Sequence, residues 1–299
     1  MSERQTYKYL SAKFEAAGLE PKTNYGQNFL IDMNLLDLIV RTADIQPNDV
    51  ILEVGTGMGS LTSKMAPLAG HVITVEIDRD MAAMAKSELR DFDNISLLNY
   101  DALKNKNHFR EELIEKIQAE CKLLPVAKLK LVANLPYNVA TPIVSNMLSI
   151  TPIAERMVVT IQKELAERIT APPGVKDYSA LSIWIQSQAD CEIVRLMSPK
   201  VFWPKPRVES AILKISPNAQ KRARLVDPEY FHSIVRGIFC HRRKLLRSSL
   251  ASALPDSFSK AHIDELLSET DFRPDVRAEQ LSVEQIIALV DKLRLAVIG

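Results

Sequence analysis

The sequence has few cysteines, and the three it has lie far apart. Cys121, Cys191 and Cys240 are odd in number and widely spaced, which indicates neither a disulfide framework nor a Cys-x-x-Cys metal site. The five histidines, at positions 71, 108, 232, 241 and 262, show no ligand spacing either. We therefore predict a protein without a bound metal.

The chain also lacks a long apolar run and a strong net charge. No apolar segment approaches the roughly 20 residues that cross a bilayer, and Met1 to Gly18 is too charged for a secretion signal. We therefore expect a cytoplasmic protein that contacts no membrane. A formal net charge of +1 over 299 residues means that any basic surface for nucleic acid must be local. The length suits a catalytic domain and a smaller second domain.

Asn134-Leu135-Pro136-Tyr137 is the most informative segment that is present. It follows the apolar run Leu129 to Ala133, which predicts an amide and an aromatic ring just past a strand end. Ligands bind at the ends of parallel strands in doubly wound folds, and an amide with a ring suits a flat base that carries an exocyclic amine. A proline turn with a core tyrosine is the alternative, and the segment alone does not decide between them.

A glycine-rich turn follows another predicted strand. Val50 to Val54 is a short apolar run interrupted by Glu53, and it leads into Gly55-Thr56-Gly57-Met58-Gly59 and a helix-like stretch from Ser60 to Ala66. Strand, glycine turn and helix are typical of nucleotide binding, because glycines let the backbone approach a ligand and helix N–H groups face it. The Gly-x-Gly-x-Gly spacing differs from the dinucleotide form, which favours a ligand without a pyrophosphate.

Two acids follow the next two predicted strands. The run from Val72 reaches Glu76, 17 positions beyond Gly59 and close to the spacing of roughly 20 at which a carboxylate meets a ribose diol. Asp101 follows a third strand that begins at Ile95. A solvated acid at a strand end is the alternative interpretation of Glu76. Three consecutive strands are thus predicted to end in a glycine loop, a glutamate and an aspartate.

This constellation resembles the class I S-adenosylmethionine-dependent methyltransferases, and Asn134 to Tyr137 narrows the resemblance to enzymes that methylate exocyclic nitrogens of bases. Further motifs resemble the ribosomal RNA adenine dimethyltransferase family, in particular its small-subunit branch, which modifies two adjacent adenosines near the 3′ end of that RNA. These motifs are Gln27 to Leu30, Gln162 to Glu164, Phe202 to Ala211, and Phe239 to Lys244 followed by Arg247. The resemblance runs from about Asn24 to the end of the chain.

The resemblance implies a fold, a cofactor and a partner. The fold is α/β, a class I (Rossmann-like) methyltransferase with a seven-stranded, mostly parallel sheet and a small helical C-terminal domain. The cofactor is S-adenosyl-L-methionine, and the partner is small-subunit ribosomal RNA within an immature ribosomal subunit. We expect the enzyme to act as a monomer during ribosome biogenesis.

The resemblance also implies roles for individual residues. The expected cofactor contacts are Asn28, Leu30, Gly55, Gly57, Gly59, Glu76 on the ribose, Ile77 on the adenine face, Asp101 on the adenine amine, and Asn134. The Asn134 side-chain oxygen and the Leu135 carbonyl would accept the N–H groups of the target amine, with Pro136 fixing the backbone between them. Tyr137 and Phe202 would stack on the extruded base, although Phe202 also suits simple core packing.

Positive charge is concentrated in two segments, Lys200 to Arg207 and His241 to Arg247. Four permanently charged side chains lie within the seven residues that begin at His241, and helical spacing would bring Arg243 and Arg247 onto one face. A solvated surface is the usual explanation for such a run, and the family resemblance favours RNA backbone contact. The predicted RNA contacts are Lys205, Arg207, Arg242, Arg243, Lys244 and Arg247.

The organisation along the chain follows from these anchors. Residues 53–162 alternate strands and helices, with a fifth strand over Arg156 to Gln162, and residues 191–197 and 209–216 predict an antiparallel edge pair. Beyond Ser216, apolar residues at helical intervals predict helices over 230–253, 262–268 and 283–297, with Ser282 as an N-cap. We predict a methyltransferase domain over residues 1–216 and a helical RNA-binding domain over residues 217–299.

The sequence is also compatible with other functions. Related enzymes modify a large-subunit adenosine or double as mitochondrial transcription factors, and DNA adenine methyltransferases often carry Asp where Asn134 stands. From another class, the chain could act mainly as an RNA-binding assembly factor with dispensable catalysis. Ser179 departs from the family pattern, which usually has glycine after the tyrosine at position 178.

Overall fold

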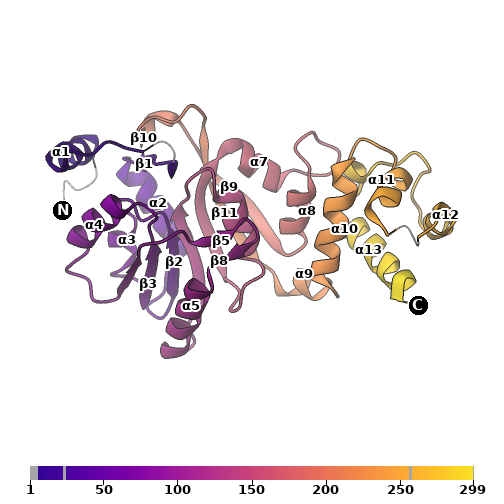
Figure 1. The fold of residues 1–299 in the computed structure, drawn as a ribbon, viewed down its shortest axis with the longest axis horizontal. Coiled ribbons are helices and arrows are strands. Elements are labelled where there is room, and N and C mark those ends of the chain that lie inside the picture. Colours follow the sequence, from indigo (N-terminus) through magenta and orange to yellow (C-terminus); the bar gives the residue numbers. More distant parts are fainter. Residues whose placement is uncertain (1–5, 23–24, 256–257, 299) are drawn as a thin grey trace. The chain divides into compact units, whose positions relative to one another are not determined.

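A computed structural model describes residues 6–22, 25–255 and 258–298 of the chain. These residues form two compact units (Figure 1). The first comprises Met1–Ala166 and Glu192–Pro217, and the second comprises Glu167–Cys191 and Asn218–Gly299. No helix among the described residues is long and apolar enough to span a membrane.

The first unit is built on a seven-stranded sheet in the order β4-β3-β2-β7-β8-β11-β9. Its strands are β2 (Val50–Val54), β3 (His71–Val75), β4 (Ile95–Leu98), β7 (Leu129–Asn134), β8 (Arg156–Gln162), β9 (Ala189–Met197) and β11 (Ser210–Pro217). The first five of these pair in parallel, and β11 runs antiparallel to β8. The predicted seven-stranded, mostly parallel sheet is confirmed, and β8 has the predicted bounds.

Four helices connect the parallel strands: α3 (Thr62–Met65), α4 (Arg79–Glu88), α5 (Glu111–Leu123) and α6 (Ala140–Asn146). Helix α2 (Met33–Ala43) precedes β2, and α7 (Lys163–Thr170) follows β8. The helix after the glycine turn is shorter than the predicted 60–66, because residues 57–61 form turns before α3 begins. Asp32 and Asp78 cap α2 and α4 by accepting hydrogen bonds from backbone N–H groups of the first turn.

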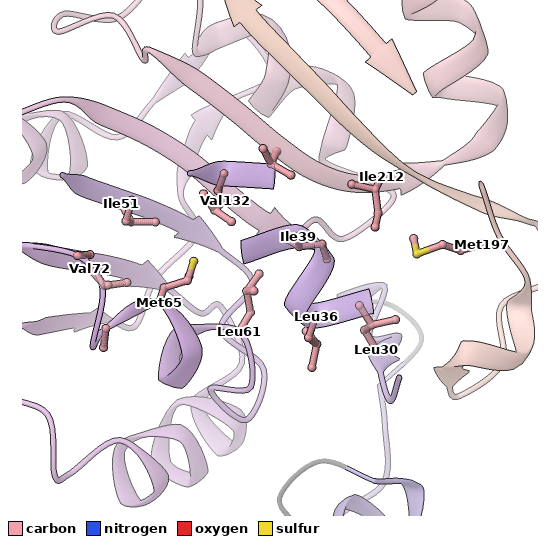
Figure 2. Close-up of a cluster of buried hydrophobic side chains, with 14 of the residues drawn as sticks. Leu30, Leu36, Ile39, Ile51, Leu61, Met65, Val72, Val132, Met197 and Ile212 are labelled. Atoms are coloured by element: carbon pink, nitrogen blue, oxygen red, sulfur yellow. The ribbon is translucent and has the colours of Figure 1, made fainter. Parts of the chain in front are cut away.

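A buried apolar cluster joins α2 and α3 to one face of the sheet (Figure 2). Leu36 and Ile39 of α2 contribute to it, together with Ile51, Val132 and Ile212 from three strands. Five consecutive residues of β2 are buried, as expected for a central parallel strand covered on both faces. This packing fixes the carboxyl ends of the strands, where the predicted site lies.

Two short ribbons stand apart from the main sheet, β5 (Leu103–Asn105) with β6 (His108–Phe109), and β1 (Phe29–Leu30) with β10 (Phe202–Trp203). In the second ribbon Phe29 pairs with Trp203 and Leu30 with Phe202. Two motifs far apart in the sequence are therefore joined. An additional helix, α1 (Tyr7–Ala17), precedes the ribbon and was not predicted.

The second unit is helical. Its helices include α8 (Ala180–Gln186), α9 (Ala219–Ala223), α10 (Pro228–Cys240), α11 (Leu246–Ala253), α12 (Lys260–Ser268) and α13 (Val283–Ile298). The predicted Ser282 cap is confirmed, because the Gln285 N–H donates to its hydroxyl at 3.2 Å. Ser179 caps α8 with an extended φ of −151°, so this position needs no glycine here.

The single helix predicted over residues 230–253 is wrong. It is two helices, α10 and α11, separated by a turn at His241 to Leu245. The Leu246 N–H donates to the Val276 carbonyl and Leu245 forms a bridge with Arg277, so contacts with a distant segment replace helical hydrogen bonds. Arg243 therefore lies in a turn and does not share a helical face with Arg247, which lies on α11.

Candidate active site

A cavity of about 160 Å³ lies in the first unit, at the carboxyl ends of β2, β3, β4 and β7. Residues 25–30, the glycine turn, and the loop after β7 also line it. The predicted site residues that it brings together are Asn28, Leu30, Gly55, Gly57, Glu76, Ile77, Asp101, Asn134, Leu135, Pro136 and Tyr137. Segments more than 100 positions apart in the sequence thus share one pocket wall.

The Asn134 side chain has a fixed orientation. Its Nδ2 donates to the backbone carbonyl of Asn28 at 2.8 Å, which identifies the other branch of the amide as the oxygen. Among the described residues, neither the Asn134 Oδ1 nor the Leu135 carbonyl accepts a hydrogen bond. Two acceptors at the tip of β7 are therefore unused by the protein and available to a ligand.

The Glu76 carboxylate is held by backbone donors on both oxygens. The Gly57 N–H donates to Oε2 at 2.8 Å, and the Asp78 N–H donates to Oε1 at 3.0 Å. Burial raises the pKa of Glu76, while these hydrogen bonds favour its ionised form. Each oxygen keeps a further lone pair, so the group can accept from two neighbouring hydroxyls.

The three glycines of the turn serve different purposes. All have positive φ, at 90° for Gly55, 55° for Gly57 and 81° for Gly59. A Cβ on Gly55 would lie 3.2 Å from Pro136 Cδ, and one on Gly57 would lie 3.0 Å from the Phe29 ring. Gly59 does not line the cavity, and its Cβ would meet Leu89 at 2.9 Å. Gly55 and Gly57 shape the pocket wall, whereas Gly59 permits close internal packing.

Glu53, the acid that interrupts the apolar strand β2, is buried in the same wall. The Thr62 and Thr74 hydroxyls both donate to its Oε2, the second at 2.6 Å, and the Thr56 and Thr74 hydroxyls are hydrogen-bonded to each other at 2.6 Å. Burial raises the pKa of Glu53 to about 8. The sequence had signalled Glu53 only as a polar residue in an apolar run, and its role was missed.

Tyr137 is anchored from outside the pocket. Its hydroxyl and that of Ser210, at the start of β11, form a hydrogen bond of 2.6 Å, and Ser210 is fully buried. Burial also raises the pKa of the Tyr137 phenol. Phe202, the other predicted stacking residue, does not line the cavity; it is buried in the apolar cluster with Leu30.

The predicted RNA-contact residues differ in their surroundings. In the second unit the Arg242 guanidinium donates to the backbone carbonyls of Lys176 at 2.6 Å and Tyr178 at 2.9 Å, and Arg247 forms a two-pronged ion pair with Asp264. Arg243 and Lys244 are exposed and have no ion pair among the described residues. In the first unit Lys205 and Arg207 are also exposed.

Within the described part of the chain, no group of three or more His, Cys, Asp or Glu side chains could hold a metal ion. The cavity wall instead combines backbone N–H groups, amide and carbonyl oxygens, and carboxyl groups around apolar side chains. Such a set suits an uncharged or cationic organic ligand with hydroxyl and amine groups.

A family model, curated relatives and a solved structure that are similar to this chain all carry descriptions of adenosine or ribosomal RNA methylation. The family model "Ribosomal RNA adenine dimethylase" matches residues 18–294. The chain is 38% identical over 285 residues to ribosomal RNA small subunit methyltransferase A of Pediococcus pentosaceus, covering 95% of this chain and 93% of that protein. It is 39% identical over 280 residues to the protein of the same name from Lactiplantibacillus plantarum, covering 93% and 92%. A dimethyladenosine transferase structure from Plasmodium falciparum superposes with a TM-score of 0.72 at 26% identity, covering 88% of this chain and 96% of that one.

The raised pKa of Glu53 predicts how stability changes with pH. The folded carboxyl, with a pKa of about 8, keeps a proton that the unfolded carboxyl, with an ordinary pKa of 4.5, has already released. Stability is therefore lost as the pH rises through this window, by on the order of a few kcal/mol. Glu53→Gln resembles the protonated acid and should remove this loss, so that the variant is more stable than the wild type above about pH 8.

Urea denaturation at several pH values measures this difference. Glu115→Gln, at an exposed position on α5, is the matched control and should follow the wild-type curve. Parallel curves for wild type and Glu53→Gln across the whole pH range would contradict a raised pKa at this site.

Proposed function

Because this chain belongs to the ribosomal RNA adenine dimethylase family, we propose that it dimethylates N6 of two adjacent adenosines near the 3′ end of small-subunit ribosomal RNA. The family match and the relatives at 38–39% identity cover nearly the whole chain. The chain is an S-adenosylmethionine-dependent ribosomal RNA adenine dimethyltransferase. The orientation of the Asn134 amide, whose oxygen accepts no hydrogen bond from the described residues, is the observation on which the proposed chemistry depends.

The pocket fits S-adenosylmethionine. Gly55 and Gly57 have positive φ, and a Cβ at these positions would crowd Pro136 at 3.2 Å and Phe29 at 3.0 Å, so a side chain at either would disturb the pocket wall. The Glu76 carboxylate, fixed by two backbone N–H groups, suits the two ribose hydroxyls. We assign Asn28 and Leu30 to the methionine end, Ile77 to the adenine face and Asp101 to the adenine amine, and each of these residues lines the cavity.

The acceptors at the tip of β7 orient the target amine. The lone pair of an adenine N6 is delocalised into the ring, so the amine is a poor nucleophile until it is held out of plane. S-adenosylmethionine supplies a methyl group that its sulfonium already activates. The Asn134 Oδ1 and the Leu135 carbonyl accept the two N–H groups, which lets the nitrogen pyramidalise and directs its lone pair toward the donor. No base is required before attack, because the proton becomes acidic only after alkylation.

Tyr137 is the proposed stacking partner for the extruded base. Its ring lines the cavity, and the hydrogen bond to buried Ser210 fixes the ring plane. Phe202 supports the β1–β10 ribbon from the core, so we assign it to positioning this ribbon and not to the exposed face of the base.

RNA backbone contacts are assigned to exposed cations that have no protein partner. Arg243 and Lys244 in the second unit and Lys205 and Arg207 in the first meet this criterion among the described residues. Arg242 and Arg247 were predicted to contact RNA, but Arg242 already donates to backbone carbonyls and Arg247 to Asp264.

We further propose that residues 1–216 carry methyl transfer, that residues 217–299 bind RNA, and that the enzyme acts as a cytoplasmic monomer on an immature subunit.

Substrate choice can be measured directly. Purified protein and labelled S-adenosylmethionine are incubated with naked small-subunit RNA, immature small subunits, or large-subunit RNA, and modified nucleotides are mapped. We expect dimethyladenosine at two adjacent positions near the 3′ end of small-subunit RNA, with assembled particles as the preferred substrate. Transfer confined to large-subunit RNA would overturn the proposed function.

Asn134→Ala should remove the hydrogen bond that orients the amine and also the contact with Asn28. We expect both methyl transfers to slow by at least roughly 10²-fold, because lost transition-state hydrogen bonds typically have effects of this size. Asn107→Ala, at an exposed position, is the control and should retain full activity. An Asn134→Ala enzyme that still dimethylates at a near wild-type rate would show that the amine is oriented by other groups.

The assignment of cations predicts separate outcomes for two neighbouring arginines. Arg243→Ala and Lys244→Ala should each weaken RNA binding and reduce the slope of log K against log salt by about 0.7 to 0.9, without changing the melting temperature. Arg242→Ala should lower the melting temperature, because two loop carbonyls lose their donor. Binding titrations over a salt series and thermal melts distinguish these outcomes. Equal salt slopes for wild type and both exposed variants would contradict the assignment.

A further inference from the structure

Helix α1 lies outside the segment that the family model matches, which begins at residue 18. Its sequence explains why it forms. The Thr6 hydroxyl accepts from the Tyr9 N–H at the N-terminus, and Gly18 ends the helix with a left-handed φ of 64°. Leu10 and Phe14, one turn apart, are its buried residues, so α1 packs through one apolar stripe.

Phe14 belongs to an aromatic cluster that supports the pocket wall. Its ring lies 5.5 Å from that of Phe29 and 5.1 Å from that of Trp203, both in edge-on contact, and these two residues pair in the β1–β10 ribbon. The Phe29 ring in turn packs against Gly57, and Met58 of the glycine turn is buried in the same apolar cluster as Leu10 and Phe14. Figure 1 shows α1 beside this ribbon.

Polar contacts attach the same segment to α4. The Tyr9 hydroxyl and the Lys13 ammonium both donate to Glu88 at 2.8 Å. Farther along, Lys22 pairs with Asp78 and Asp80.

A second set of contacts carries the segment to the pocket. Gln27 Nε2 donates to Asp78 Oδ2 at 2.9 Å. Asp78 is also the residue whose N–H donates to Glu76, so the N-terminal segment reaches the ribose carboxylate through one intermediate residue.

We propose that α1 is a positioning element for the methyl donor: by burying Phe14 it holds Phe29 against the glycine turn, packs on Met58 of that turn, and so increases donor affinity. This inference rests on the proposed function, in which the cavity binds S-adenosylmethionine. Coupling between two equilibria is reciprocal, so donor binding must strengthen the docking of α1 by the same factor.

Calorimetric binding of S-adenosylhomocysteine to the full chain tests the first half of the inference. We expect Phe14→Ala to raise the Kd about tenfold, within the usual range of coupling between sites, with a smaller increase for Phe14→Leu. Glu15→Ala, at an exposed position on the same helix, is the matched control and should leave the Kd unchanged. RNA affinity and the rate at saturating donor should change little in all three variants. A general loss of structure would instead lower both.

Hydrogen exchange of the wild type tests the reciprocal half. S-adenosylhomocysteine should slow the exchange of amides in residues 10–17, none of which lines the cavity. If Phe14→Ala does not fold, the double variant Tyr9→Phe/Lys13→Met removes both contacts with Glu88 while leaving Phe14 in place, and it should raise the Kd about twofold to fivefold.

The outcomes separate this inference from the proposed function. If the wild type binds S-adenosylhomocysteine but the α1 variants bind it equally well and α1 exchange is unchanged, α1 only stabilises the fold and the inference is wrong. If the wild type itself does not bind, the assignment of the cavity to the donor fails, and the inference fails with it.

Discussion

The hydrogen bond from the Asn134 amide to the Asn28 carbonyl is the constraint on which the rest of the site depends. It joins the end of β7 to a segment 106 positions earlier in the chain. A freely rotating amide could present either its NH₂ or its oxygen to a ligand, and only the oxygen can accept from an amine. By occupying the NH₂ group, the Asn28 carbonyl makes the pocket an acceptor of hydrogen bonds at this point. Asn28 directly precedes β1, so the same contact also attaches the β1–β10 ribbon to the end of β7 at the pocket wall.

The glycine turn shows how backbone conformation and charge are arranged around this contact. Gly57 has a positive φ, and its N–H donates to Glu76, which fixes the carboxylate. Glu53 is buried just before the turn, and its raised pKa keeps it largely neutral near pH 7, so Glu53 adds little negative charge beside Glu76. The Thr62 and Thr74 hydroxyls donate to the buried acid without introducing a cation, and the Thr56 hydroxyl is hydrogen-bonded to that of Thr74. The wall can thus present the carboxyl groups of Glu76 and Asp101 to a ligand while Glu53 stays largely neutral.

The sequence was sufficient for the sheet and for much of the pocket wall. β-branched runs are strong local signals, and parallel strands that end in a glycine turn, Glu76, Asp101 and Asn134 must bring these groups to one edge. What it could not predict depends on tertiary contacts. The break between α10 and α11 arises because the distant segment around Val276 takes over hydrogen bonds at Leu246. Arg242 and Arg243 are adjacent and alike in sequence, yet one is held by loop carbonyls and the other is exposed, which no local pattern distinguishes.

Dimethylation places a further demand on the two acceptors at the tip of β7. A monomethylated amine has one N–H left, so the second transfer must proceed with one of the Asn134 and Leu135 oxygens unpaired. Leu135 is buried, with 1% of its surface exposed, whereas Asn134 is only partly buried. Leaving a buried carbonyl without a donor costs about 1–3 kcal/mol, and a partly exposed amide oxygen can be hydrated at lower cost. Under the proposed roles, the remaining N–H is therefore better directed to the Leu135 carbonyl in the second step, with the first methyl group displaced toward the more open side near Asn134.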